Sequence, residues 1–246
     1  MSTYRDAAVV LRKLDYGEAD RIFTLLTRDH GKIGAIAKGV RRVNSKLAAA
    51  LELYTQVDVL LAHGRTLDVV AEARRAGEAP RLDADLERTS RAALVVELAE
   101  RICEDRHPLE GLYELTVNAL DGLAVDPEPR RAAAWFLARA LDLMGYAPQL
   151  TVCARCGRQL APEPAPFEAA AGGFVCSSCA DHAAPMVPVA AIKVLRVMFA
   201  PDAPLYGRLK LDPGIMDDVE DVLADQLEYH LDRRLNSLRF LRRLRT

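Results

Sequence analysis

The stretch Ala7–Lys38, AAVVLRKLDYGEADRIFTLLTRDHGKIGAIAK, decides the fold class of this chain. Three runs rich in apolar and β-branched residues, Ala7–Lys13, Ala19–Thr27 and Lys32–Lys38, are separated by the tripeptides Asp-Tyr-Gly and Asp-His-Gly. Short runs of this composition between glycine-containing turns are typical of β-strands. The stretch therefore predicts three successive strands.

The pattern changes after these strands. Ser45–Leu53 (SKLAAALEL) predicts a short helix, with Ser45 as its N-cap. Two alternating strands follow, joined by a tight turn at His63-Gly64, and their apolar positions are Val57, Val59, Leu61, Leu67, Val69 and Ala71. The order of three strands, a helix and two strands is that of an OB-fold, a five-stranded barrel whose loops and exposed face bind oligonucleotides in many proteins.

From Pro80 onward the apolar spacing becomes helical. It predicts helices at Leu86–Asp105, Leu109–Leu123, Pro129–Met144, Val189–Phe199 and along one stretch from about Ile215 to Leu244. We interpret the apolar stripe of the last stretch as core-facing, with a partner-binding face as the alternative. The chain is thus expected to be a multidomain α+β protein: an OB-fold at 1–80, a helical domain at 81–148 and 188–246, and a cysteine-containing insertion at 149–187.

Four cysteines lie in the insertion as two Cys-x-x-Cys pairs: Cys153, Cys156, Cys176 and Cys179. Each pair can supply two corners of a tetrahedron, and nearby glycines allow the tight turns that this requires. Four thiolates fill every position around Zn²⁺, so the pattern predicts one structural zinc ion. Disulfides or unrelated core cysteines are the alternative. His182 could replace a ligand but is interpreted as a surface histidine, and Cys103 as a buried cysteine.

Positive charge is concentrated at the two ends of a chain whose formal net charge is −2. Residues 1–46 hold ten lysines and arginines against five acidic residues, and residues 233–246 hold six arginines and no acidic residue. An anionic partner would therefore meet these two regions. Arginine suits phosphate recognition, although GC-rich coding DNA would produce the same preference for arginine.

The sequence offers no catalytic constellation. It contains no phosphate-binding GxxxxGK[ST] loop, no HExxH, and no H-x-E that would make the cysteine pairs a deaminase site. Nor does it contain an apolar run long enough to cross a bilayer, or a signal-type apolar block near residue 1. We expect a cytoplasmic, non-enzymatic protein that does not enter membranes.

Several motifs carry a family resemblance that covers nearly the whole chain. They are Tyr16-Gly17-Glu18 with Asp20-Arg21, HGKIGAIAKGVRR at His30–Arg42, the Gly64-Arg65 turn, CARCG, FVCSSC, and HLDRRLNSLRFL at His230–Leu241. In this combination the chain resembles the RecO family of bacterial recombination mediators.

The resemblance implies an OB-fold, a helical domain and a zinc module. It also implies binding of single- and double-stranded DNA, annealing of complementary strands, and loading of RecA, together with RecR, onto DNA coated by single-stranded-DNA-binding protein. The implied place of action is the cytoplasm, on the nucleoid. No nucleotide hydrolysis is implied, in agreement with the missing phosphate loop.

The segment KGVRRVNSK at Lys38–Lys46 is the strongest candidate for a DNA contact. Its four cations, Lys38, Arg41, Arg42 and Lys46, follow the third predicted strand, and no acidic residue lies between residues 30 and 51. We expect these side chains to have no local salt-bridge partner and to contact phosphates. A solvated charge run is the alternative. Weaker candidates for extending the contact are Arg12, Arg21, Arg65 and, for stacking on a base, Tyr16.

Two other classes of protein fit parts of the pattern. A zinc-containing adaptor could use an OB-fold to bind protein, and would have no salt-dependent affinity for DNA. A metal-dependent nuclease would need carboxylates that converge on a cleft, and would degrade DNA in the presence of Mg²⁺.

Overall fold

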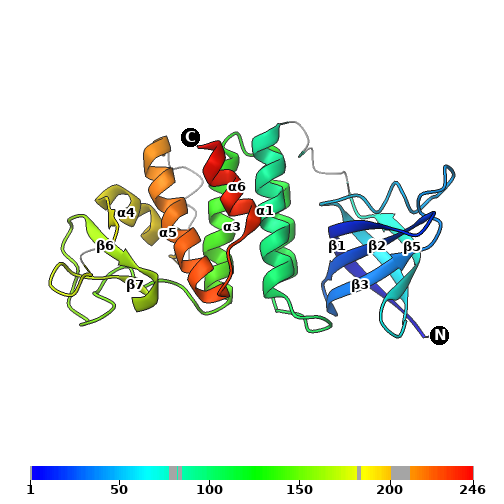
Figure 1. The fold of residues 1–246 in the computed structure, drawn as a ribbon, viewed down its shortest axis with the longest axis horizontal. Helices are drawn as coiled ribbons and strands as arrows, with labels where there is room; N and C mark the ends of the chain where they lie inside the picture. The colour runs from blue at the N-terminus through cyan, green and yellow to red at the C-terminus, as the bar shows by residue number, and fades with distance from the viewer. Residues whose placement is uncertain (1, 78–81, 83–84, 182–183, 201–210, 246) are drawn as a thin grey trace. The chain divides into compact units, whose positions relative to one another are not determined.

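The computed structural model describes residues 2–77, 82, 85–181, 184–200 and 211–245 (Figure 1). The chain forms two compact units, Met1–Pro129 and Arg130–Thr246. The predicted domain boundaries remain a prediction, and the predicted limit at residue 80 lies outside the described residues.

A closed five-stranded barrel forms the first part of the first unit. Its strands are β1 (Thr3–Tyr16), β2 (Asp20–Thr27), β3 (Gly31–Ala37), β4 (Gln56–Ala62) and β5 (Asp68–Arg75). They are ordered β1-β2-β3-β5-β4, and β1 also pairs with β4 to close the barrel. Only β3 and β5 pair in parallel. This is the predicted OB-fold topology.

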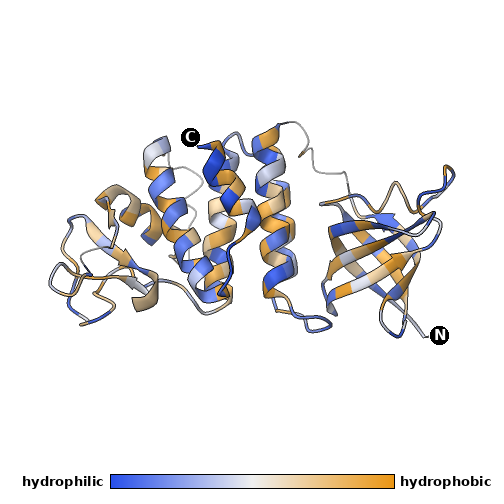
Figure 2. Cartoon of the chain, viewed as in Figure 1, coloured by the Kyte–Doolittle hydropathy of each residue, from blue (hydrophilic) through white to orange (hydrophobic). Residues whose placement is uncertain are grey.

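The barrel core consists of side chains that point inward from alternate strand positions. Figure 2 shows hydrophobic and hydrophilic residues alternating along the barrel strands. Phe23, Leu25 and Ile33 are among the largest fully buried side chains. The predicted inward positions Val57, Val59 and Leu61 of β4 are confirmed, since each is at most 1 % exposed.

The predicted phase of β5 is wrong by one residue. Asp68 and Val70 are buried, whereas Val69 is half-buried and Ala71 is exposed. The pairing of β4 with β5 has a register shift between Leu60 and Leu61, and such an irregularity inverts which face each side chain meets. The link at 63–67 is also longer than the tight turn that we predicted.

The predicted helix at Ser45–Leu53 does not form; the described segment is a series of turns. Its turns are closed partly by backbone amides, as where the Leu47 carbonyl accepts from the Ala50 and Leu51 N–H groups, and partly by side chains. The Thr55 hydroxyl donates to the Ala50 and Glu52 carbonyls, and Arg75 donates to that of Ala49. Leu51 is buried in the barrel core. Tertiary contacts therefore override the local helix preference.

A buried polar network closes one end of the barrel. The carboxylate of Asp68, which is completely buried, accepts hydrogen bonds from the Tyr4 hydroxyl (2.6 Å), the Gly64 N–H (3.0 Å) and Arg106 Nη2 (2.8 Å). Burial alone would raise the pKa of Asp68, but the bonds from Arg106, Gly64 and Tyr4 hold it below its usual value. One charged group thus connects β1, the β4–β5 link and the segment that follows the first helix.

Two helices complete the first unit. They are α1 (Leu86–Ile102) and α2 (Leu112–Val125), which lie within the predicted ranges or within two residues of them. Asp85 caps α1 by accepting a hydrogen bond from the Arg88 N–H (2.7 Å). Lys32 of β3 donates to the Glu100 carbonyl (3.0 Å), so α1 is fixed against the barrel.

The second unit combines helices with a small three-stranded sheet. The helices are α3 (Pro129–Leu143), α4 (Val189–Met198), α5 (Pro213–Leu231) and α6 (Asn236–Leu244). The sheet has the order β7-β6-β8, formed by Gly173–Phe174, Ala165–Glu168 and Met186–Val187, with the 3₁₀ turn η1 (Ala169–Ala171) after β6. No helix among the described residues is both long enough and apolar enough to span a bilayer.

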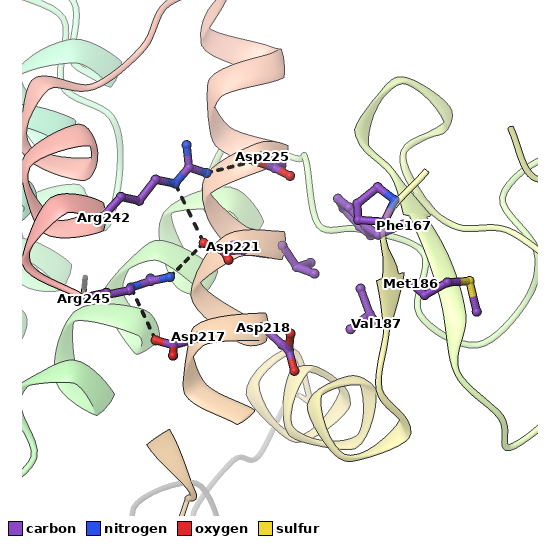
Figure 3. Close-up of a pocket in the computed structure, with 11 residues that line it drawn as sticks. Phe167, Met186, Val187, Asp217, Asp218, Asp221, Asp225, Arg242 and Arg245 are labelled. Atoms are coloured by element: carbon purple, nitrogen blue, oxygen red, sulfur yellow. Dashed lines mark hydrogen bonds and ion pairs between the residues drawn. The ribbon is translucent and has the colours of Figure 1, made fainter. Parts of the chain in front are cut away.

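The predicted continuous helical stretch from Ile215 to Leu244 is two helices. It breaks at Asp232, which has a left-handed backbone conformation (φ 49°), before Leu235 leads into α6. The break lets α6 return along α5, where Arg242 bonds Asp225 (2.9 Å) and Arg245 bonds Asp221 (2.8 Å; Figure 3). The core-facing interpretation of the stripe is confirmed, because Val219, Leu223, Leu227, Leu235, Leu238 and Leu241 are buried.

The Asp68 network generates a stability prediction. We expect Arg106→Met to lower the free energy of unfolding by about 2–3 kcal/mol, because it leaves a buried carboxylate short of donors; the value is at the lower end because Arg106 is 44 % exposed. The loss should shrink as the pH falls below about 4, where Asp68 becomes protonated first in the unfolded chain and then in the folded one. Urea denaturation at several pH values measures both effects.

The matched control is Arg74→Met. Arg74 pairs with Asp58 at 2.9 Å, but the two side chains are 84 % and 46 % exposed, so we expect a loss below about 1 kcal/mol. Equal losses in the two variants, or a loss in Arg106→Met that does not change with pH, would contradict the role given to Asp68.

Candidate nucleic-acid interface and metal centre

The basic loop after β3 is held against the turn between β1 and β2. The Gly39 N–H donates to the Asp20 carboxylate (2.7 Å), and the Arg41 N–H donates to the Ala19 carbonyl (2.9 Å). Gly39 has a positive φ of 64°, which glycine adopts with little strain. These contacts hold the start of the basic loop against the turn that joins Tyr16 to Asp20.

Arg41 has an ion-pair partner that we did not predict. Its Nε lies 3.5 Å from one oxygen of Asp15, whose other oxygen accepts from Arg21 Nε at 2.6 Å. The Arg21 hydrogen bond, followed by the charges of Arg41 and Arg21, lowers the pKa of Asp15. The expectation that the loop cations lack a salt-bridge partner is therefore wrong for Arg41. Asp15 precedes β2 in the sequence and Arg41 follows β3, and the fold brings the two side chains together.

The other three cations of the loop fit the expectation. Lys38, Arg42 and Lys46 are exposed, and within the described part of the chain none of them forms an ion pair. Two large hydrophobic side chains of this region are also exposed: Tyr16, the last residue of β1, is 55 % exposed, and Val43 of the loop is fully exposed. Unpaired cations can neutralise phosphates, and an exposed aromatic ring can stack on a base.

Two of the weaker candidates lie apart from this group. Arg12 projects from the middle of β1 toward α1, where its Nη1 is 3.9 Å from Glu100. Arg65 lies in the β4–β5 link, near the residues of β1 that pair with Ala62, at the other end of that strand from Tyr16. The structure therefore brings Arg21 and Arg41 together on Asp15, beside the turn that follows Tyr16, and places Lys38, Arg42 and Lys46 on the loop bonded to that turn. It does not bring Arg12 or Arg65 to them.

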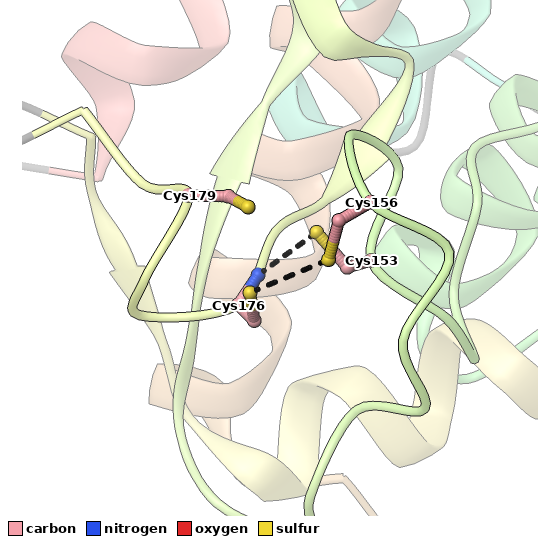
Figure 4. A group of neighbouring side chains, drawn as sticks. All are labelled: Cys153, Cys156, Cys176 and Cys179. Carbon is pink, nitrogen blue, oxygen red and sulfur yellow. Dashed lines mark hydrogen bonds between the residues drawn. The ribbon is translucent and has the colours of Figure 1, made fainter.

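The four cysteines of the insertion meet in space (Figure 4). Their sulfur atoms all lie within 4.8 Å of one another, and the Sγ atoms of Cys156 and Cys176 are 3.8 Å apart. Each Cys-x-x-Cys pair forms a tight turn, closed by Gly157 N–H to the Cys153 carbonyl (2.8 Å) and by Cys179 N–H to the Cys176 carbonyl (2.9 Å). Such a donor set can hold one metal ion.

The protonation of the cysteines also suits a cation. Burial would raise the pKa of Cys153, but backbone N–H groups of Cys176, Cys156 and Arg155 lower it to about 6, so this sulfur is a thiolate at neutral pH. Hydrogen bonds to Cys176 and Cys156 raise the pKa of Cys179 to about 12. Neighbouring thiolates repel one another, and a bound divalent cation removes that repulsion.

The surrounding chain brings the two turns together. Gly173 pairs with Gln149, and a Cβ atom at Gly173 would lie 2.4 Å from the Gln149 carbonyl oxygen, so only glycine fits. Glu168 accepts hydrogen bonds from Arg155 (2.7 Å) in the first turn and from the Asp181 N–H (2.7 Å) after the second. His182 lies outside the described residues. Cys103 is buried in the other unit and takes no part.

The site residues that we did not predict from the sequence are two aspartates whose carboxylates accept hydrogen bonds. Asp15 and Asp20 flank the first turn and hold the basic loop, but their partners in that loop, Arg41 and Gly39, are distant along the chain. Only the motif Tyr-Gly-Glu-x-Asp-Arg at Tyr16–Arg21 gave a signal, and we interpreted it as a family mark.

Comparisons with known proteins agree with this architecture. Residues 1–77 match the family model described as Recombination protein O N terminal, and residues 83–239 match Recombination protein O C terminal. A curated relative, DNA repair protein RecO of Bifidobacterium longum (strain DJO10A), is 41 % identical over 247 residues, covering 98 % of this chain and 99 % of the relative. An OB-fold barrel, six helices among the described residues and a four-cysteine cluster with these matches define a protein of DNA repair and recombination. The chain belongs to the RecO family.

Proposed function

We propose that this chain is a DNA-binding recombination mediator whose barrel contacts DNA through the basic loop after β3. The observation that carries the proposal is the set of exposed cations that form no ion pair with any described residue, Lys38, Arg42 and Lys46, on a loop that is bonded to the turn after the exposed Tyr16. Phosphates would neutralise the cations, and a base of a single strand would stack on Tyr16. A loop of this charge also fits duplex DNA, whose phosphates it contacts in the same way.

Arg21 and Arg41 contribute differently to this interface. Both are bound to Asp15, so a phosphate must compete with a carboxylate for their guanidinium groups. We therefore assign the larger share of DNA affinity to Arg42 and its unpaired neighbours. Asp15 holds the two guanidinium groups close to each other.

The finer activities rest on family membership. We infer that the protein anneals complementary strands and, with RecR, loads RecA onto DNA coated by single-stranded-DNA-binding protein. We further infer that it acts in the cytoplasm on the nucleoid and catalyses no reaction itself, so DNA incubated with the protein and Mg²⁺ should stay intact.

We also infer that the metal of the four-cysteine site is zinc. A set of four cysteine sulfurs around one point matches the tetrahedral, sulfur-rich coordination that Zn²⁺ takes in structural sites. Cys153, Cys156, Cys176 and Cys179 would hold it, and no position would be left for a reacting water. Its contribution would be to fix the two turns and the small sheet beside them.

The DNA interface can be tested by salt-dependent binding. If all four loop cations contact single-strand phosphates, they should contribute roughly −3 to the slope of log affinity against log salt, at about −0.7 for each contact. Arg41→Glu/Arg42→Glu should weaken binding and flatten the slope by roughly 1.4. Fluorescence anisotropy with labelled single- and double-stranded oligonucleotides measures both quantities.

Single variants supply the matched control. Arg42→Glu and Arg101→Glu change the net charge equally, and both side chains are exposed, but Arg101 lies in the last turn of α1. Only Arg42→Glu should have a large effect. If the double variant binds DNA with unchanged affinity and slope, the loop serves solubility or a protein partner, as in the adaptor alternative.

Zinc content tests the metal assignment. Protein purified without chelator should contain close to one zinc per chain by elemental analysis, and Cys153→Ser should contain much less and melt at a lower temperature. The variant should keep its affinity for DNA through the barrel loop. Cys103→Ser is the control and should keep the metal. A zinc content far below one per chain in the unaltered protein would refute the assignment.

The RecR partnership is tested by co-elution. A mixture with RecR at micromolar concentration and low salt should elute as one complex in size-exclusion chromatography, and that mixture should speed RecA loading on coated single strands. Separate elution of the two proteins would count against this part of the proposal while leaving the DNA contact intact.

A further inference from the structure

A groove of about 570 Å³ lies in the second unit between α5 and the small sheet (Figure 3). Its sheet wall is apolar and includes Phe167, Met186 and Val187. Its helix wall carries a row of aspartates at 217, 218, 221 and 225 of α5. The groove therefore joins a hydrophobic wall to a negatively charged one.

Most of the acidic row is already paired on one side. Asp217 accepts from Arg130 (2.5 Å), Asp221 from Arg245 (2.8 Å) and Asp225 from Arg242 (2.9 Å). Asp218 forms no ion pair among the described residues, and Figure 3 shows it on the side of α5 that is nearer to Val187. The groove thus keeps one carboxylate available to a ligand, next to an apolar wall.

Asp218 has acidic neighbours on α5. The described residues that line the groove include four aspartates and two arginines, Arg242 and Arg245, and a third arginine, Arg130, is bonded to Asp217. Burial, and then the neighbouring carboxylates of Asp221 and Asp217, raise the pKa of Asp218. A positive charge placed beside Asp218 would relieve this repulsion.

The apolar wall has a large exposed side chain at its rim. Met186 is 60 % exposed, whereas Phe167 and Val187 behind it are 3 % and 4 % exposed. Methionine is flexible and polarisable, and surfaces that bind varied protein segments use it often. Covering Met186 would remove apolar surface from water, which favours association.

The chemistry of the groove selects one class of ligand. Three of the four aspartates are paired with arginines, so the carboxylate of Asp218 is the charge of the row that a ligand meets. This carboxylate repels a phosphate, and one carboxylate offers too few ligands to hold a metal ion. An arginine or lysine with apolar neighbours matches both walls at once.

We propose that this groove binds a basic, amphipathic segment of a partner protein, with a cationic side chain on Asp218 and apolar side chains on Met186 and Val187. Charge complementarity and the exposed methionine decide in favour of this occupant. The inference concerns a surface of the second unit and is independent of the DNA contact at the barrel loop.

Fluorescence anisotropy with the full chain and a labelled probe tests the proposal. The probe is a short amphipathic helix of leucine, alanine and arginine; the reference peptides replace every arginine by glutamate, or every leucine by serine. We expect saturable binding of the probe alone. Asp218→Lys should weaken it at least about tenfold (about 1.4 kcal/mol), and Met186→Ser should weaken it as well.

The matched control is Glu163→Lys, which makes the same charge change at an exposed position that does not line this groove. It should leave probe binding unchanged. No saturable binding, equal binding of the glutamate peptide, or equal weakening by Asp218→Lys and Glu163→Lys would overturn the proposal. Sedimentation that finds a dimer lost in Asp218→Lys would also overturn it, since a second copy would then be the occupant.

Discussion

The buried carboxylate of Asp68 is the constraint on which the first unit depends. A charge without solvent contact is tolerated only with several donors around it, and here the donors come from three separate parts of the chain: Tyr4, Gly64 and Arg106. The first strand, the link before β5 and the segment after α1 must all be in place for the charge to be satisfied. The network therefore selects one arrangement of barrel and helix, which apolar contacts alone would fix less specifically.

Arginine side chains also have different partners in the two units. In the second unit Arg130, Arg242 and Arg245 are bound to the acidic residues of α5 and hold helices together. In the basic loop of the barrel, Arg42 has no such partner among the described residues. Counting arginines along the sequence would assign Arg242 and Arg245 to an anionic ligand as readily as Arg42, whereas the structure shows both of them bound to acidic residues of α5.

Much of the fold could be predicted from the sequence, because β-branched runs and helical apolar spacing are local signals. The five strands, the places of the helices and the meeting of four cysteines followed from such signals. The failures have tertiary causes. At Ser45–Leu53 the packing of Leu51 in the barrel core and the side-chain hydrogen bonds of Thr55 favour turns over a helix, and a register shift at Leu60/Leu61 inverts β5. A left-handed Asp232 divides the last stretch into two helices, although its leucine spacing continues across the break. For the site, cations were visible in the sequence, but Asp15 and Asp20 were not recognisable as their supports, since the contacts join distant loops.

The pairing of β1 with two partners has a consequence for how the chain folds as it is synthesised. Its hairpin with β2 joins residues that are close in sequence, since Tyr16 pairs with Asp20. Its other edge pairs with β4, in which the partner of Thr3 is the distant Ala62. The barrel therefore cannot close until β4 and β5 have left the ribosome, and until then β1 presents an open edge. The contacts that hold the basic loop to the first turn need only β1 to β3. The loop can thus take its shape on an unfinished barrel, well before the apolar interior is sealed.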